Sequence, residues 1–304
     1  MEEALRSFFL QLAQNKAMNS WAKRYGLRFG ANRFVAGETI EAAIETVRQL
    51  NRSGIAVTLD HLGEFVADES EARASADYCV KTLDAIHAAG ADSSLSLKLT
   101  QIGLDISKDL CLENMRMILN RASSHDLWVN IDMEDFARCQ VTLDIFRELA
   151  ASYEKVQTVI QSYLYRSLAD VEALTEMGAS IRLVKGAYKE PESVAYPDKK
   201  DVDASYLKML DVHLPSSGLT SIATHDENII NYAKRAIAEK NIGKHQYEFQ
   251  MLYGIRTDLQ QSLAKEGYSV RIYVPYGDDW YGYFMRRLAE RPANVQFVLK
   301  GVLH

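Results

Sequence analysis

A stripe of polar side chains near the C-terminus has the residue types and the spacing needed to grip a small carboxylate. Its members are Tyr283, Arg286, Arg287 and Glu290. Their i, i+3, i+4 and i+7 spacing places them on one face of a predicted helix. Two adjacent guanidinium groups repel each other unless anions face them, and their planar forks suit a bidentate grip on a carboxylate. On its own, the stripe is also typical of a solvated helix face with an internal salt bridge.

Lys98 is a second candidate, because it lies inside the apolar run of residues 95–99. A lysine in a strand is costly unless it points into a polar mouth and meets an anion. A desolvated lysine could form a Schiff base, as in aldolases, whereas a charged lysine would pair with a substrate carboxylate or with Asp132. With the two arginines it would make a cationic pocket, which Asp132 and Glu64 would partly neutralise. Such a pocket suits a small acid that also carries an amine.

The elements that must position these residues follow a regular rhythm. Short apolar or β-branched runs alternate with helix-like patterns, which is typical of a parallel sheet with helical crossovers. The predicted strands are residues 54–60, 95–99, 128–132, 158–163, 181–186, 221–225, 247–252 and 270–276. The clearest predicted helices are residues 38–50, 72–89, 110–121, 134–151, 168–177 and 227–239.

Eight such units, with no second zone of composition, favour a closed barrel over an open sheet. The predicted fold class is therefore α/β, a (β/α)8 TIM-type barrel with extra N-terminal helices. The strands are nearly continuous apolar runs, as expected when both faces of a sheet are buried. We predict a single domain, in which residues 1–50 form a helical segment that packs on a barrel of residues 51–304.

Polar side chains recur at or near the C-terminal end of every predicted strand. A barrel places its functional residues at this end, so the set is expected to surround one site. Its members are Asp60, His61, Lys98, Asp132, Gln161, Arg182, Lys185, Thr224, His225, Gln250 and Tyr273.

Composition excludes several classes of protein. A net charge of −6 over 304 residues argues against a general nucleic-acid binder. The three cysteines have unpatterned spacings and no CxxC or HExxH occurs, so we expect buried free thiols and no metal site. We see no signal peptide and no run of roughly 20 apolar residues that would span a membrane. No GxGxxG follows the first strand and no GxxxxGK[ST] occurs, so these motifs reveal no cofactor.

Five short motifs, in order along the chain, resemble those of the proline dehydrogenase family. They are RLVKGAY at residues 182–188, ATHD at 223–226, YEFQMLYG at 247–254, YVPYG at 273–277 and the C-terminal stripe. The resemblance extends over residues 54–290, nearly the whole barrel. In length the chain is similar to the monofunctional bacterial enzymes, which lack the aldehyde-dehydrogenase portion of bifunctional relatives.

The resemblance implies a distorted (β/α)8 barrel that binds FAD without a Rossmann domain. The implied reaction is oxidation of L-proline to Δ1-pyrroline-5-carboxylate by hydride transfer to flavin N5. Electrons would pass to a membrane quinone, and a separate pyrroline-5-carboxylate dehydrogenase would take the product. The expected location is the cytoplasm, with peripheral contact at the inner face of the cell membrane, and no nucleic-acid partner is expected.

The resemblance also implies roles for the residues around the substrate. The two arginines would clamp the proline carboxylate with help from the lysine, and the two tyrosines would wall the pyrrolidine ring. Glu64 would pair with Arg286 and hold the last helix over the substrate. Asp132 would support Lys98 and Tyr273 from behind. The substrate-binding set is Lys98, Leu252, Tyr273, Tyr283, Arg286 and Arg287.

For the cofactor, the resemblance implies a set drawn mainly from the middle strands. Arg182 would lie near flavin N5 and favour negative charge on the reduced ring. Gly186 and Ala187 are small enough for the backbone to approach the cofactor. A helix that begins in residues 226–230 would point its N-terminus at a phosphate. The full set is Gln161, Arg182, Lys185, Gly186, Ala187, Tyr188, Thr224, His225, Gln250 and Glu290.

Three alternatives remain beside this interpretation. Another flavin barrel, similar to methylenetetrahydrofolate reductase, would bind flavin and oxidise NAD(P)H. A Schiff-base aldolase would use Lys98 or Lys185 and would bind no flavin. A catalytically silent barrel that senses amino acids would need the same carboxylate clamp, although it would have no use for Arg182 beside a redox ring.

Overall fold

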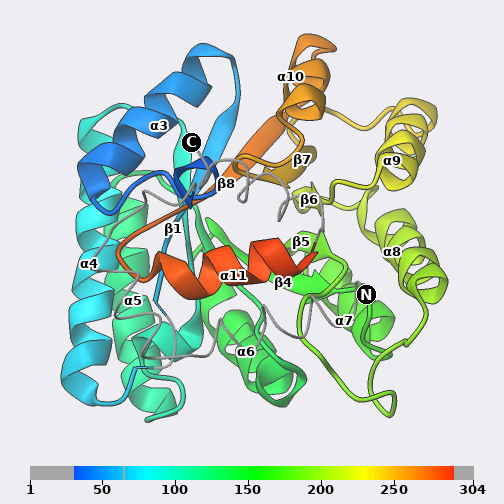
Figure 1. Cartoon of the computed structure of the whole chain (residues 1–304). Coiled ribbons are helices and arrows are strands. Elements are labelled where there is room, and N and C mark those ends of the chain that lie inside the picture. The colour runs from blue at the N-terminus through cyan, green and yellow to red at the C-terminus, as the bar shows by residue number, and fades with distance from the viewer. Residues whose placement is uncertain (1–30, 64–65, 291–304) are drawn as a thin grey trace.

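The chain forms a closed barrel of parallel strands in the order β1 to β8, which β1 closes by pairing with β8 (Figure 1). The structure, a computed structural model, describes residues 31–63 and 66–290, without the side chains of residue 31 and of residues 286–290. The strands are β1 (Ala56–His61), β2 (Ser93–Leu97), β3 (Val129–Ile131), β4 (Val156–Gln161), β5 (Ser180–Val184), β6 (Thr220–Ala223), β7 (Tyr247–Leu252) and β8 (Val270–Tyr276).

Helices connect each strand to the next and surround the barrel. Those from α4 to α10 are the crossovers, so the predicted alternation of strand and helix is confirmed. The helices are α3 (Ile40–Arg52), α4 (Glu69–Ala88), α5 (Lys108–Ser124), α6 (Phe136–Ala150), α7 (Ser167–Glu176), α8 (Lys199–His213), α9 (Glu227–Glu239), α10 (Thr257–Lys265) and α11 (Trp280–Glu290), with short 3-10 turns η2 (Ala31–Arg33) and η3 (Leu99–Ile102).

Side-chain caps explain where several helices begin. The Asp68 carboxylate accepts a hydrogen bond from the Glu71 backbone N–H, so α4 begins three residues before the predicted start at residue 72. Ser107 caps α5 in the same way, through the Leu110 backbone N–H. Asp226 caps α9, whose bounds match the prediction. Capping residues lie just before the apolar pattern begins, so a prediction from periodicity alone starts some helices late.

The interior of the barrel is polar, which the apolar appearance of the strands did not predict. The Gln157 side chain of β4 donates to the Ser221 hydroxyl of β6 at 3.0 Å. Because β4 and β6 are not neighbours, this bond must cross the barrel interior. Thr58 of β1 and Ser94 of β2 share a 2.8 Å hydrogen bond on the same side of the sheet. Both faces of the sheet are buried as expected. Apolar strand side chains point outward and pack on the helices, whereas polar strand side chains point into the barrel.

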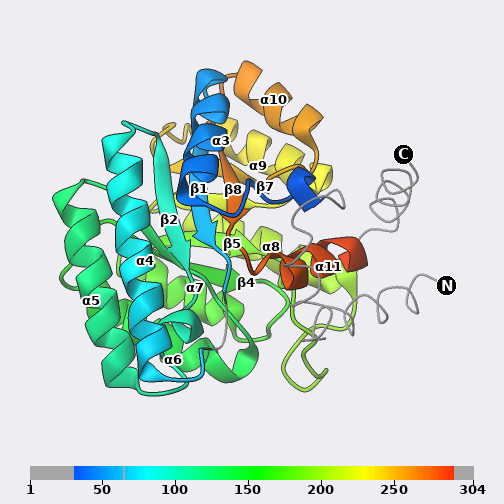
Figure 2. The same cartoon turned by 60° about the vertical axis from the view of Figure 1, so that its left-hand side comes forward.

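The first and last described helices depart from a regular barrel. α3, which precedes β1, contacts both β1 and β8 and so covers the outside of that seam. α11, which follows β8, instead lies across the C-terminal ends of the strands (Figures 1 and 2). An apolar cluster that includes Phe34, Leu62, Ile255, Trp280 and Phe284 holds it there.

The predicted division of the chain at residue 50 falls inside α3, which spans Ile40–Arg52. The hydrogen bond from the Ala36 backbone N–H to the Pro275 carbonyl, at 2.9 Å, joins the segment before α3 to β8. Residues 1–30 lie outside the described ranges, so the predicted N-terminal helical segment stays a prediction there. Within the described ranges, no helix is long and apolar enough to span a membrane.

Candidate functional site

A cavity of 590 Å³ opens at the C-terminal ends of the strands, beneath α11. Side chains from every strand or from the loop that follows it line this cavity. Among the strand-end candidates only His61 does not, because it stacks on Tyr78 at a ring-centroid distance of 4.0 Å. The predicted residues that line the cavity are Asp60, Lys98, Asp132, Gln161, Arg182, Lys185, Gly186, Ala187, Tyr188, Thr224, His225, Gln250, Leu252, Tyr273 and Tyr283.

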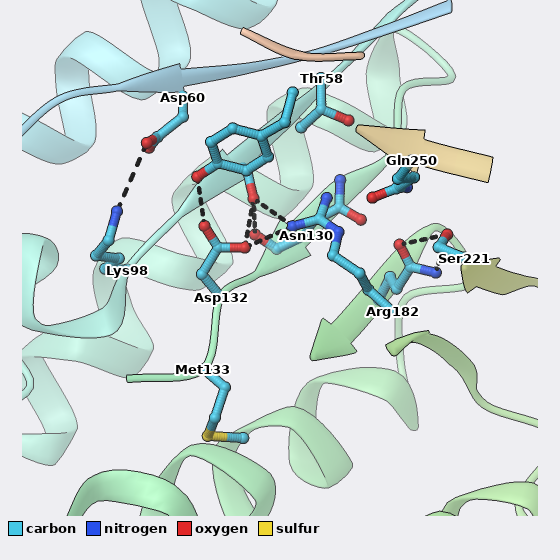
Figure 3. A network of polar contacts seen from close by, with 12 residues as sticks. Thr58, Asp60, Lys98, Asn130, Asp132, Met133, Arg182, Ser221 and Gln250 are labelled. Atoms are coloured by element: carbon cyan, nitrogen blue, oxygen red, sulfur yellow. Dashed lines mark hydrogen bonds and ion pairs between the residues drawn. The ribbon is translucent and has the colours of Figure 1, made fainter. Parts of the chain in front are cut away.

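Asp132 is the centre of a hydrogen-bond network at the inner end of the cavity (Figure 3). The Tyr273 hydroxyl donates to Asp132 Oδ2 at 2.6 Å, and Arg182 Nη1 donates to Asp132 Oδ1 at 2.6 Å. Ser96 Oγ donates to the same Oδ1 at 2.8 Å and accepts from Arg182 Nη1 at 3.2 Å. These four residues come from four different strand units, so only barrel closure brings them together.

The Tyr273 phenol remains protonated in this network. Removal of water raises the pKa of its hydroxyl well above the ordinary value, and the nearby charge of Asp132 raises the pKa further. The Arg182 guanidinium also lies over the Tyr273 ring, 5.4 Å from the centroid, where the ring quadrupole attracts the cation. A neutral ring that is held on two sides is a rigid wall for a small ligand.

The Arg182 guanidinium has two further N–H donors that form no hydrogen bond with the described residues. Only 4% of its side chain is exposed, and Nη1 is bound to Asp132 and Ser96. Its Nε and Nη2 atoms are buried and have no hydrogen-bond partner among the described residues. Buried donors without partners cost free energy, so these two N–H groups are suited to a ligand acceptor that binds in the cavity.

Lys98 is positioned by a carboxylate different from the one expected. Its ammonium group pairs with Asp60 Oδ2 at 3.6 Å, and only 12% and 2% of the two side chains are exposed. Asp132, which was expected to support Lys98 and Tyr273 together, binds Tyr273 and Arg182. The strand-end position of Asp60 was noted in the sequence, but its partner could be identified only from the structure. Lys98 also lies just after β2 and just before η3, rather than inside a strand.

Gln161 and His225 present polar groups to the middle of the cavity. The Gln161 side-chain amide donates to the Glu134 carbonyl at 3.2 Å, while its Oε1 is buried and has no partner among the described residues. His225 Nε2 accepts the Leu252 backbone N–H at 3.0 Å, so a neutral imidazole here carries its proton on Nδ1. An unpartnered acceptor and an oriented imidazole fit a polar, multi-atom ligand.

A profile described as Proline dehydrogenase matches residues 43–300 of the chain. The chain belongs to the proline dehydrogenase family. It is 52% identical over 299 residues to Proline dehydrogenase 1 of Bacillus subtilis strain 168, covering 98% of this chain and 99% of that protein. It is 50% identical over 278 residues to Proline dehydrogenase of Deinococcus radiodurans, covering 90% of both.

Solved structures related to the proline dehydrogenase family share the fold. Proline utilization A from Bdellovibrio bacteriovorus superposes with a TM-score of 0.80 at 26% identity. The match covers 86% of this chain and 32% of that much longer one. The enzyme family and the TIM-type barrel inferred from the sequence are therefore confirmed. Membership of this family replaces the folate-reductase, aldolase and sensor alternatives.

The outer end of the cavity carries four charged groups that the proline dehydrogenase motifs only partly predicted. Lys185 pairs with Asp203 at 2.6 Å and with Asp226 at 2.7 Å. Lys199, at the start of α8, pairs with the same two carboxylates. Burial raises the pKa of Asp226, but hydrogen bonds from Lys185 and Lys199 outweigh burial and lower the pKa to about 2.

Gly186 must be glycine for a steric reason beside the predicted approach to the cofactor, which stays a prediction. Its φ of +110° is strained for other residues, and an added Cβ would lie 2.1 Å from Cδ1 of Tyr163. The close approach is therefore between the backbone and a buried tyrosine of the neighbouring loop. Gln250 likewise has a protein partner, since its amide donates to the buried Glu248 carboxylate.

The lining includes residues that the sequence interpretation did not select. Met133 follows Asp132, and because its side chain is apolar it does not stand out among the polar residues at the strand ends. The sequence did not indicate Lys199 as a site residue, because the irregular segment of residues 185–198 separates it from the end of β5. Glu64 and the side chains of Arg286, Arg287 and Glu290 lie outside the described residues, although the helix predicted to carry the stripe is present as α11.

Proposed function

We propose that this chain oxidises L-proline to Δ1-pyrroline-5-carboxylate with FAD as its resident cofactor. The observation that carries the proposal is the Arg182 guanidinium, which is buried in the cavity and whose Nε and Nη2 have no hydrogen-bond partner among the described residues. A cationic donor pair in a dry site favours a ligand that gains negative charge, as a flavin ring does when it is reduced. Family membership supports the same choice of cofactor and substrate.

The lining of the cavity fits such a cofactor along its length. Arg182, Gln161 and Gln250 would contact the ring system, and Met133 and Tyr188 would pack against it. Thr224, His225 and Lys185 would hold the more distant parts, with Gly186 and Ala187 forming the adjacent wall. When bound, FAD supplies a hydride acceptor.

The inner end of the cavity suits proline. Lys98 would hold the carboxylate, and Arg286 and Arg287 would complete the clamp from α11. Tyr273 and Tyr283 would enclose the ring, while Leu252 would contact its apolar edge. The cationic surroundings favour the neutral amine by lowering its pKa, and a neutral amine has the lone pair that oxidation at the adjacent carbon requires.

Two further parts of the proposal concern partners and location. Electrons would leave to a membrane quinone, which requires the protein to meet the inner face of the cell membrane from the cytoplasm. The product, a cyclic imine in equilibrium with an aldehyde, would pass to a separate pyrroline-5-carboxylate dehydrogenase. Both parts rest on the family resemblance.

An absorption spectrum of the purified chain, recorded before and after anaerobic addition of L-proline, tests the proposal. We expect flavin bands that bleach with L-proline and not with NADH. Flavin bands that do not change when L-proline is added, or an absence of bands even after FAD is supplied, would contradict the proposal.

The Arg286→Met variant tests the carboxylate clamp. Its flavin content should remain and its KM for proline should rise by about 100-fold, since one charge-assisted contact is lost. An unchanged KM would refute the clamp.

A further inference from the structure

The four charged groups at the outer end of the cavity form a closed cluster. Lys185 lies between Asp203 and Asp226, at 2.6 Å and 2.7 Å. Lys199 contacts the same two carboxylates, at 3.2 Å from Asp226. Both lysines and Asp226 line the cavity. Two ammonium groups and two carboxylates therefore balance within one cluster, which shares a wall with the ligand space.

The cationic groups of the cavity are divided between its two ends. At the inner end, Lys98 and Arg182 are bound to Asp60 and Asp132. Lys185 comes three residues after Arg182, and at about 3.3 Å per residue the two positions lie roughly 10 Å apart along the strand direction. A dinucleotide flavin has its ring at one end and its two phosphates at a distance from that ring. If the ring lies beside Arg182, the phosphates reach the outer end.

Two helices also begin at the outer end. Lys199 is the first residue of α8, and Asp226 is the residue before α9. The first turn of a helix presents backbone N–H groups and a partial positive charge, which favour a bound phosphate. The start of α8, which has no side-chain cap, thus adds to the attraction that the two lysines exert on an anion, whereas the Asp226 carboxylate already caps α9; the start of α8 would not define a site without the lysines.

We propose that Lys199 binds the pyrophosphate of FAD together with Lys185, and that Asp203 and Asp226 are internal counter-ions that hold both ammonium groups at the cavity wall. This proposal rests on the proposed use of FAD. Family motifs pointed to Lys185 alone, whereas Lys199 is assigned here from its position in the cavity and its shared partners. The phosphates would share the two ammonium groups with the carboxylates.

The expected effect of Lys199 is modest and sensitive to salt. Its side chain is 71% exposed, so water and ions screen its charge more than they screen Arg182. Lys199→Met should therefore raise the dissociation constant of FAD about fivefold at low ionic strength. The difference from wild type should shrink as salt is added, because screening removes an electrostatic contribution and leaves a packing contribution unchanged.

The test is a titration of the cofactor-stripped full chain with FAD, followed by flavin fluorescence at two salt concentrations. Lys200→Met is the matched control, because Lys200 is the exposed neighbour on the same helix turn and does not line the cavity. Lys199→Arg should retain most of the affinity. Asp203→Asn removes a partner that Lys199 and Lys185 share without removing either cation, so it should weaken FAD binding less than Lys199→Met does.

Each outcome separates the two proposals. If wild type binds no FAD, the proposed function fails and the role of Lys199 fails with it. If wild type binds FAD and Lys199→Met binds it equally well, only the role of Lys199 is refuted. If Lys199→Met and Asp203→Asn weaken binding to the same extent, independently of salt, the lysine acts through helix stability and the phosphate contact is refuted.

Discussion

At the inner end of the cavity the charged groups are buried and Asp132 makes short hydrogen bonds to its partners, whereas at the outer end four charged groups balance one another and one of them, Lys199, is exposed. Asp132 has 13% of its side chain exposed and holds Arg182 and Tyr273 at 2.6 Å each. Lys199 at the outer end is 71% exposed. The comparison shows that charges are screened differently at the two ends of one cavity. The inner end excludes water and holds its charged groups rigidly, which suits catalysis, whereas the outer end is screened by solvent, which suits binding of a charged part of a ligand.

The difference between the two ends is tested most directly by removing one carboxylate from each end. Asp132→Asn leaves the Arg182 cation buried without its counter-charge, so we expect kcat/KM for proline to fall by about 10²–10³ and the free energy of unfolding to fall by about 3 kcal/mol. Asp226→Asn should change kcat/KM by less than about threefold, because its partners are partly exposed. Proline-dependent dye reduction and urea unfolding measure both. Equal losses in the two variants would contradict the comparison.

A smaller effect is expected at the ring that walls the inner end. Tyr273→Ser opens space beside the substrate, so the preference for proline over 4-hydroxyproline should fall about tenfold. Tyr273→Phe keeps the ring but loses the hydrogen bond to Asp132, and it separates the effect of volume from that of the network. The measurement is the ratio of kcat/KM for the two substrates. A ratio that Tyr273→Ser leaves unaltered would show that the phenol ring does not limit ligand size.

The buried hydroxyl of Ser96 should give a still smaller effect. Ser96→Ala removes one hydrogen bond to Asp132 and one from Arg182, which costs about 1 kcal/mol and should lower kcat/KM about threefold to tenfold. Ser94→Ala is the control, because Ser94 is buried on the same strand and bonds Thr58 instead. If the two variants lose activity equally, Ser96 contributes to the barrel interior and not to the Asp132 network.

The smallest effect concerns pH and the outer end. The pKa of Asp226 is lowered from 3.8 to about 2, so the folded chain binds this proton less tightly than the unfolded chain does. The stabilisation is therefore complete above pH 4 and is lost as the pH falls toward 2. The difference in unfolding free energy between wild type and Asp226→Asn should shrink between about pH 4 and about pH 2. A constant difference would show that the carboxylate charge is not what stabilises the fold.

Much of the fold could be predicted because its signals are local. The bounds of β7, β8 and α9 agree with the predicted ones, since each is a strong periodic run between turn residues. The start of α4 and the end of β2 were misplaced where a capping Asp68 and a 3-10 turn after Lys98 interrupt the pattern. The polar barrel interior escaped prediction, because alternation along a strand does not reveal which face points inward.

The candidate site, like the fold, has some features that are local in the sequence and others that depend on the tertiary structure. By itself the sequence determined the kinds of group that the strand ends supply, since a residue type and its position in a βα unit are local properties. Only the tertiary structure decided the pairings of Asp60 with Lys98, of Asp132 with Arg182, and of Lys199 with Asp226. Partners separated by tens of residues meet only when the barrel closes, and hydrogen bonds depend on ångström distances that no residue spacing along the chain encodes.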